Sequence, residues 1–182
     1  MTADLAESAA RQAAAFFASA RRALVEAMPP DPDLAVLEIG CGSGATGALA
    51  LRLGKAGAWI GIETDPKAAA EALYALTDVI TLDPAGTPPL GSRSSFGLIL
   101  ATEGLLAFPR PERSLKAVVP LLRHGGRVRL ALPGKGADKK AGLSAGQVKA
   151  LVARAGLKLV SLKASGGGFL KSPKRIEAVA KR

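Results

Sequence analysis

Residues 36–49 read VLEIGCGSGATGAL, an apolar strand that carries one carboxylate and runs into closely spaced glycines and an alanine-rich helix. Glycine lets backbone amides approach a ligand closely and accepts positive φ angles. A helix N-terminus adds unpaired N–H groups and partial positive charge, which suit a phosphate or a carboxylate. Residues 59–63, WIGIE, then read as a second strand that ends in an acid, and a carboxylate there can accept both ribose hydroxyls. The pattern predicts a site for a nucleoside-containing cofactor.

The glycine spacing separates the classes of nucleoside cofactor. Residues 42–47 satisfy the dinucleotide pattern G-x-G-x-x-G, which is weak evidence by itself. The glycines begin earlier, at Gly40, and Glu38 lies two residues before them. An acid in that place repels a pyrophosphate, whereas it attracts an α-amino group or a sulfonium. The spacing therefore argues against a nicotinamide or flavin dinucleotide.

These residues resemble the first motif of the class I S-adenosylmethionine-dependent methyltransferases, (V/L)-(L/V)-(E/D)-(I/V)-G-x-G-x-G, especially the small single-domain members of types 11 and 12. The similarity covers roughly residues 34–134 and extends more loosely to the C-terminus. The resemblance implies that S-adenosylmethionine is the cofactor. It also implies the site residues: Gly40, Gly42 and Gly44 would lie under the methionine part of the cofactor. By the same resemblance, Glu38 would lie near the amino group of the methionine part, Glu63 would bind the ribose hydroxyls and Asp83 would lie near the adenine amino group.

Each of these roles has a structural alternative. The glycines could form only a tight strand-to-helix turn. Glu63 could cap the next helix, although Asp65 before Pro66 is the better cap. Asp83 before a proline is equally consistent with an ordinary turn. Cys41 reads as a small filler of the glycine loop, and the lone histidine, His124, reads as structural and away from the cofactor.

Residues 101–109, ATEGLLAFP, form the predicted acceptor loop. Many small-molecule methyltransferases resemble D-V-L-E-H-L-P here, which places Glu103 on their acid, Leu106 on their glutamate and Ala107 on their histidine. Only Glu103 could then serve as a base, and a helix or loop cap is the alternative. The loop also lacks the (N/D)-P-P-(Y/F) of enzymes that methylate amino groups of nucleic-acid bases or glutamine, which disfavours those substrates.

Apolar runs and helical periodicity alternate along the chain. Residues 3–28 read as a leading helix that Pro29 and Pro30 end. Strands are expected at 35–39, 58–63, 78–84, 96–101, 126–132, 157–163 and 176–181, and helices at 44–55, 66–76, 111–122 and 144–155. This alternation predicts an α/β fold with a doubly wound, Rossmann-like sheet. The resemblance implies seven strands, mostly parallel with the last antiparallel, in a single domain over residues 1–182 with residues 1–30 as its leading helix.

Composition narrows the location and the partners. The single cysteine excludes an internal disulfide. Neither a membrane span nor a secretory signal is evident, so the cytoplasm is expected. Residues 1–95 hold 7 Lys/Arg and 11 Asp/Glu, whereas residues 96–182 hold 18 and 4, a net charge of −4 against +14. This asymmetry indicates an acidic partner for the C-terminal half, with a solvated surface as the alternative.

Three functions are compatible with these patterns. The first is S-adenosylmethionine-dependent methyl transfer to a small-molecule or acidic substrate, in which the lysine-rich residues 133–142 could grip the acceptor. The second is a catalytically reduced binding protein on the same scaffold, suggested by the loss of polar groups at Leu106 and Ala107. The third is an RNA-directed methyltransferase or RNA-binding module that uses the basic half. Nucleic acid is the less favoured partner because aromatic residues for base stacking are scarce there.

Overall fold

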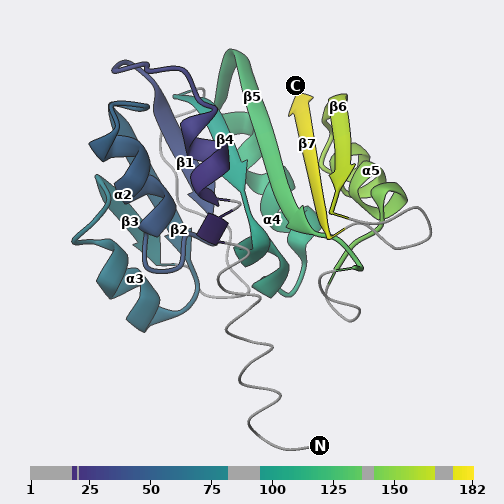
Figure 1. Ribbon diagram of the computed structural model, residues 1–182, viewed down its shortest axis with the longest axis horizontal. Coiled ribbons are helices and arrows are strands. Elements are labelled where there is room, and N and C mark those ends of the chain that lie inside the picture. The colour runs from purple at the N-terminus through teal and green to yellow at the C-terminus, as the bar shows by residue number, and fades with distance from the viewer. Residues whose placement is uncertain (1–17, 20, 82–94, 137–141, 167–173) are drawn as a thin grey trace, which may run out of the picture.

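The computed structural model describes residues 18–19, 21–81, 95–136, 142–166 and 174–182. Seven strands in this part of the chain form one sheet with helices on both faces (Figure 1). The strands are β1 (Ala35–Ile39), β2 (Ala58–Glu63), β3 (Asp78–Thr81), β4 (Phe96–Ala101), β5 (Leu122–Pro133), β6 (Lys158–Ser165) and β7 (Arg175–Lys181). The helices are α2 (Ala45–Arg52), α3 (Pro66–Ala72), α4 (Pro111–Val118) and α5 (Ala145–Arg154), with the 3₁₀-helices η1 (Glu103–Ala107) and η2 (Val119–Leu121).

The sheet has the strand order β3-β2-β1-β4-β5-β7-β6. Its strands are parallel from β3 to β5, and β7 runs antiparallel to both β5 and β6. The predicted Rossmann-like, mostly parallel sheet with an antiparallel last strand is confirmed. Strand order reverses between β1 and β4, and ligands of open α/β sheets bind beyond the carboxyl ends of the strands at such a point.

Each face of the sheet has its own apolar core. On one face, the helical residues 21–26 and helices α2 and α3 cover β1, β2 and β4, with Trp59 fully buried among them. On the other face, α4 and α5 pack on the sheet through residues such as Leu115 and Val148. In the described chain no helix covers the first face of β5, β7 and β6, which lies open toward the viewer in Figure 1.

Burial and capping explain most element bounds. The predicted bounds of β1, β2 and β4 are confirmed, and these three strands are almost entirely buried. Asp65 is the predicted cap of α3, because its side chain accepts a hydrogen bond from the Lys67 N–H at 3.0 Å. Ser144 and Gln147 form a capping box at the start of α5.

Some predicted bounds were wrong at the ends of elements. The helices expected at 44–55, 66–76 and 111–122 end earlier, at Arg52, Ala72 and Val118, and the third strand ends at Thr81. The fifth strand begins at Leu122 and not at residue 126, because Leu122 already pairs with Phe96 before a register shift. Residues 3–17, Asp83, the loop 84–94, the lysine-rich segment 137–141 and residues 167–173 lie outside the described residues. None of the described helices is long and apolar enough to cross a membrane.

Candidate functional site

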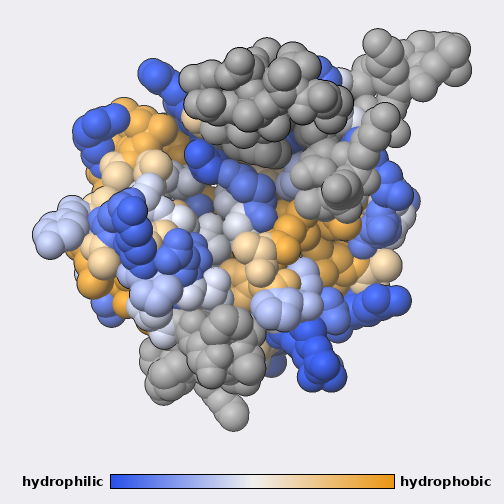
Figure 2. Space-filling model, turned by 90° about the horizontal axis from the view of Figure 1, so that it is seen from below, coloured by the Kyte–Doolittle hydropathy of each residue, from blue (hydrophilic) through white to orange (hydrophobic). Residues whose placement is uncertain are grey.

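A cavity of about 300 Å³ lies at the carboxyl ends of β1, β2 and β4, where the strand order reverses. Its walls come from the leading helix (Arg21), from β1 (Glu38), from residues 40–43 and 45–46 of the glycine loop and the start of α2, from the end of β2 (Glu63) and from residues 102–104 after β4. Figure 2 views the molecule from below, onto this edge, and shows hydrophilic side chains around a paler centre. The loop after β5 was also predicted to border this cleft, but it contributes no described residue to the walls.

Two of the three predicted glycines, Gly40 and Gly42, present bare backbone to the cavity, whereas Gly44 does not line it and faces Leu76 and Ala72 instead. Gly40, Gly42 and Gly44 have φ angles of 71°, 55° and 81°, a conformation that other residues rarely adopt. A Cβ atom on Gly40 would lie 2.3 Å from the carbonyl carbon of Gly104, so two backbones meet here without room for a side chain. A Cβ on Gly42 would meet no atom within 4 Å. The loop is therefore closed on one side by protein and open on the other toward the cavity.

Glu38 is a buried acid in the wall of the cavity, with 1% of its surface exposed. Its Oε2 accepts a hydrogen bond from the indole Nε1 of Trp59 at 2.9 Å. Burial raises the pKa of Glu38 to about 7, although hydrogen bonds from Trp59 and Thr46 and the positive charge of Arg21 act in the opposite direction. A carboxylate whose pKa is raised by burial is stabilised by any cation that enters beside it. The site thus favours a positively charged group next to Glu38.

Glu63 ends β2 and holds the glycine loop. Its Oε2 accepts from the Gly42 N–H at 2.7 Å, and its Oε1 accepts from the N–H groups of Thr64 at 2.7 Å and Asp65 at 3.1 Å. The carboxylate therefore does bind local backbone, as the capping alternative required, while it also lines the cavity. A carboxylate offers about four acceptor positions. The Thr64 hydroxyl is a fourth donor, at 3.4 Å from Oε1, so Oε1 is fully used. Oε2 accepts only from Gly42 among the described residues and keeps one acceptor position for a hydroxyl group of a ligand.

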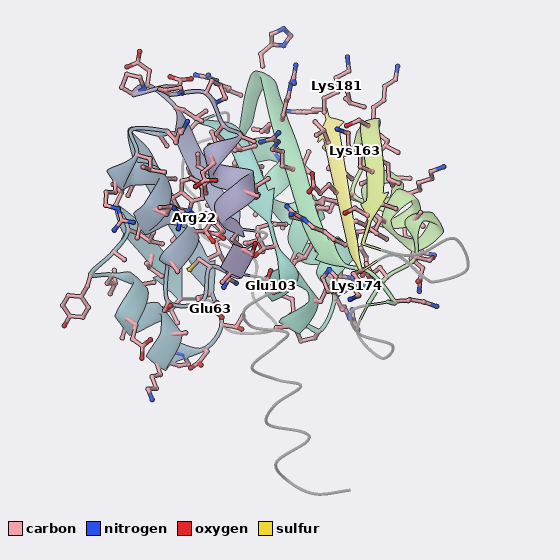
Figure 3. The ribbon with its side chains drawn as sticks, in the orientation of Figure 1. Arg22, Glu63, Glu103, Lys163, Lys174 and Lys181 are labelled. Atoms are coloured by element: carbon pink, nitrogen blue, oxygen red, sulfur yellow. The ribbon has the colours of Figure 1, made fainter. Side chains whose placement is uncertain are left out.

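Arg21 and Glu103 form an ion pair at the cavity (Figure 3 labels Glu63 and Glu103). Their side chains are 31% and 25% exposed. Arg21 is the only cationic residue among the described residues of the wall, and sequence analysis missed it. The helix-cap alternative for Glu103 is wrong, since its hydrogen-bond partner is Arg21 and not a backbone N–H. The pair joins residues 82 positions apart, so no local pattern could have revealed it.

The remaining candidates lie away from the chemistry or outside the description. Cys41 is buried, and burial together with the charges of Glu38 and Glu63 raises its pKa to about 12, so it is a filler and not a nucleophile. His124 is exposed and lines a different hollow, at β5 residues 122–127 and the C-terminus. Leu106 and Ala107 do not line the cavity. Asp83 lies outside the described residues, so its contact with adenine stays a prediction.

Comparisons with known proteins identify a family and a fold for this chain. A family model described as a methyltransferase domain matches residues 37–130. A TehB-like SAM-dependent methyltransferase from Corynebacterium glutamicum has a TM-score of 0.70 at 20% identity, with 100% of both chains covered. A SAM-dependent methyltransferase from Mesorhizobium loti has a TM-score of 0.68 at 17% identity, with 90% of this chain and 96% of that chain covered.

A third solved structure is a complex. It contains the Haloferax volcanii Trm112 methyltransferase activator and the putative methyltransferase, and it matches with a TM-score of 0.71 at 14% identity over 88% of this chain and 86% of that one. At such identities the likeness of the three structures shows the fold. A search of curated proteins finds no match to this chain.

Proposed function

The chain belongs to the methyltransferase domain family, and from this premise we propose that it transfers a methyl group from its cofactor, S-adenosylmethionine, to a small or acidic acceptor. The observation that carries the proposal is that Glu38 and Glu63 both line one cavity whose floor is bare glycine backbone. Both acids also make hydrogen bonds within the protein, to Trp59 and to the Gly42 N–H, but neither of these bonds accounts for the position of both carboxylates at one cavity. Their joint placement is what a cationic, ribose-bearing ligand requires.

The walls of the cavity fit the polar groups of this cofactor. Glu38 is suited to the α-ammonium group, Arg21 to the α-carboxylate and Glu63 to the ribose hydroxyls, each by opposite charge or by free acceptor capacity. The open side of Gly42 leaves the backbone free to lie against the ligand. When bound, the cofactor would supply a methyl group on a sulfonium sulfur, and this sulfur would leave as a neutral thioether, which is a good leaving group.

The chain's own contribution to methyl transfer is positioning and removal of a proton. An acceptor held in line at near-attack distance needs little further assistance. A hydroxyl acceptor also has to lose a proton as its new bond to carbon forms, and an ammonium acceptor has to lose one before its nitrogen can attack. Glu103 is the cavity acid to which we assign no cofactor contact, and it could take this proton. In the structure Arg21 holds Glu103. We propose that Arg21 exchanges Glu103 for the cofactor carboxylate, which leaves Glu103 free to accept the proton.

Calorimetric titration with S-adenosylmethionine and S-adenosylhomocysteine tests the cofactor site. Glu63→Ala is expected to weaken binding roughly ten- to a hundredfold, because a charged hydrogen bond to ribose and the brace on the Gly42 amide are both lost. Glu71→Ala, which removes an exposed acid from α3, is the matched control and should bind as the unmodified protein does. No heat of binding at about 1 mM ligand in the unmodified protein would refute the proposed function.

Substitution of the ion pair separates binding from catalysis. Glu103→Gln is expected to lower kcat roughly a hundredfold while the Kd for S-adenosylhomocysteine stays within about threefold, because the base is lost and the cavity is kept. Arg21→Met is expected to weaken cofactor binding at least tenfold. The measurements are single-turnover rates across a panel of hydroxyl, amine and carboxylate acceptors. Cofactor binding without turnover on any of them would favour the catalytically reduced binding protein.

A further inference from the structure

The uncovered face of β5, β7 and β6 is strongly basic. In β5 the side chains of Val128, Leu130 and Leu132 are buried in the core with α5, so the alternate residues Arg127 and Arg129 point to the opposite face. In β7 the buried residues are Ile176, Ala178 and Ala180. The alternation of that strand therefore places Arg175, Glu177, Val179 and Lys181 on the same open face as Arg127 and Arg129.

The register of β6 brings further cations to this face. Lys163 pairs with Glu177, and Lys158 pairs with Lys181. Figure 3 labels Lys163 and Lys181 beside these strands, well away from Glu63 and Glu103. We call this surface the basic face and define it by six residues: Arg127, Arg129, Lys158, Lys163, Arg175 and Lys181. It continues at one end into a hollow of about 630 Å³ that Arg127 and Lys181 share with Arg123, His124 and Arg182.

The charge of the basic face is almost uncompensated. Glu177 is its one acid, and this carboxylate is bound by Arg175 at 2.8 Å. The other five cations of the face form no ion pair with any residue that the structure describes. Like charges on paired strands repel one another. Their arrangement is stabilised when a polyanion lies across them and releases its counterions.

We propose that the basic face binds the backbone of double-helical RNA. Among the described residues the face carries no aromatic side chain, so it lacks the platform on which single-stranded bases stack. It also lacks the large apolar or aromatic anchors at the centre of most protein interfaces. Duplex RNA is held through phosphates and 2′-hydroxyls across a wide, shallow minor groove, which a broad sheet surface without protruding helices can meet. Ser161 and Ser165 place two hydroxyl groups among the cations.

The inference does not rest on the proposed function. The cavity lies where β1, β2 and β4 end, whereas the basic face is built from β5, β7 and β6. Because β7 runs antiparallel to β5, its first residue, Arg175, lies beside Pro133 at the carboxyl end of β5. The basic face therefore extends from the hollow at the far end of the sheet to the edge at which the cavity opens.

Fluorescence anisotropy with a labelled RNA duplex of about 20 base pairs tests the proposal, with a DNA duplex and a single-stranded RNA of equal length beside it. Binding to the RNA duplex is expected at about 50 mM salt. The logarithm of the association constant should fall linearly with the logarithm of the salt concentration. A triple variant removes three phosphate contacts: Arg127→Gln, Arg129→Gln and Lys163→Gln. It should reduce the magnitude of the slope of this salt dependence by about 2.7 and weaken binding at least tenfold.

A second triple variant provides the matched control. Arg113→Gln, Lys116→Gln and Lys149→Gln remove three exposed cations from α4 and α5, on the opposite face, and should leave affinity within about twofold. Equal losses in both variants would show an effect of net charge only and would overturn the proposal. So would absence of binding at about 50 mM salt, equal binding of the DNA duplex or the single strand, or displacement of the RNA by polyglutamate at equal charge.

Two further measurements keep the result interpretable. If the first triple variant does not fold, Lys163→Gln with Lys181→Gln replaces it, since both side chains are exposed and should together lower the slope by about 1.8. Binding of S-adenosylhomocysteine to both triple variants should be unchanged. If the unmodified protein did not bind the cofactor, the proposed function alone would be refuted. If it did not bind duplex RNA, the proposed role of the basic face alone would be refuted.

Discussion

Alanine at Gly40 is expected to destabilise the fold by roughly 2–5 kcal/mol and to abolish measurable cofactor binding. Two effects add at this position. The φ angle of 71° is unfavourable for any residue with a Cβ, and the new methyl group would lie 2.3 Å from the backbone of Gly104. Backbone cannot move aside as the end of a flexible side chain can. The glycine loop and the loop after β4 would therefore separate, and the cavity between them would open.

Gly54 and Gly42 provide comparison variants that separate backbone strain from contact with the ligand. Gly54 also has a positive φ, 63°, with no atom within 4 Å of a Cβ, so Gly54→Ala should cost about 1 kcal/mol and leave cofactor affinity unchanged. Gly42 has similar open space and a φ of 55°, but it lines the cavity. Gly42→Ala should match Gly54→Ala in thermal stability and differ only in cofactor affinity, at least tenfold weaker. Equal affinity of these two variants would contradict the role of the glycine loop as a ligand cradle.

Glu38→Gln is expected to stabilise the cofactor-free protein above neutral pH and to weaken its binding of S-adenosylmethionine. The pKa of Glu38 is raised to about 7 by burial, against an ordinary value of 4.5. Between these two values the folded state binds the extra proton, so the stability that Glu38 contributes is present below pH 4.5 and is lost as pH rises through about 7. The loss amounts to about 3 kcal/mol, and a neutral amide avoids it.

Denaturant unfolding without cofactor at pH 5 and pH 8 measures this change. The variant should exceed the unmodified protein by up to about 3 kcal/mol at pH 8 and by much less at pH 5. The variant should bind S-adenosylmethionine roughly ten- to a hundredfold more weakly than the unmodified protein at pH 8, because a cationic group of the cofactor loses its carboxylate partner. Trp59, the single tryptophan of the chain, donates to Glu38 and gives a fluorescence signal for the titration. A variant less stable than the unmodified protein at pH 8 would contradict the view that burial outweighs the hydrogen bonds and the Arg21 charge that favour the ionised form of Glu38.

The central strands were predictable because burial alone defines them. β1, β2 and β4 are short apolar runs between turn residues, and their bounds match the prediction. Helix ends were not predictable in the same way. The helix predicted at 44–55 ends at Arg52, because Gly54 adopts a positive φ and the chain turns toward β2. The early start of β5 depends on pairing with Phe96, which is a tertiary contact.

In the site, too, residues of a sequence motif were predictable, whereas contacts between residues far apart in the sequence were not. The glycine loop and the two acids belong to two short stretches, residues 36–49 and 59–63, and the structure brings both acids to one cavity. The hydrogen bond between Trp59 and Glu38 depends on strand register, because Val36 and not Glu38 is directly opposite Trp59. Arg21 reaches Glu103 only after the leading helix docks on the sheet. Contacts of this kind arise from the assembled fold, so a linear pattern does not contain them.

The two outer strands of the sheet, β3 and β6, affect how readily molecules of this protein aggregate. An outer strand exposes unpaired N–H and C=O groups that can template another chain, and charge, shortness and irregular register oppose this. β3 has four residues and presents Asp78 and Thr81 to solvent. β6 presents Lys158 and Lys163, and its register with β7 shifts between Leu159 and Ser161. Both ends of the sheet are thereby protected against aggregation at high protein concentration.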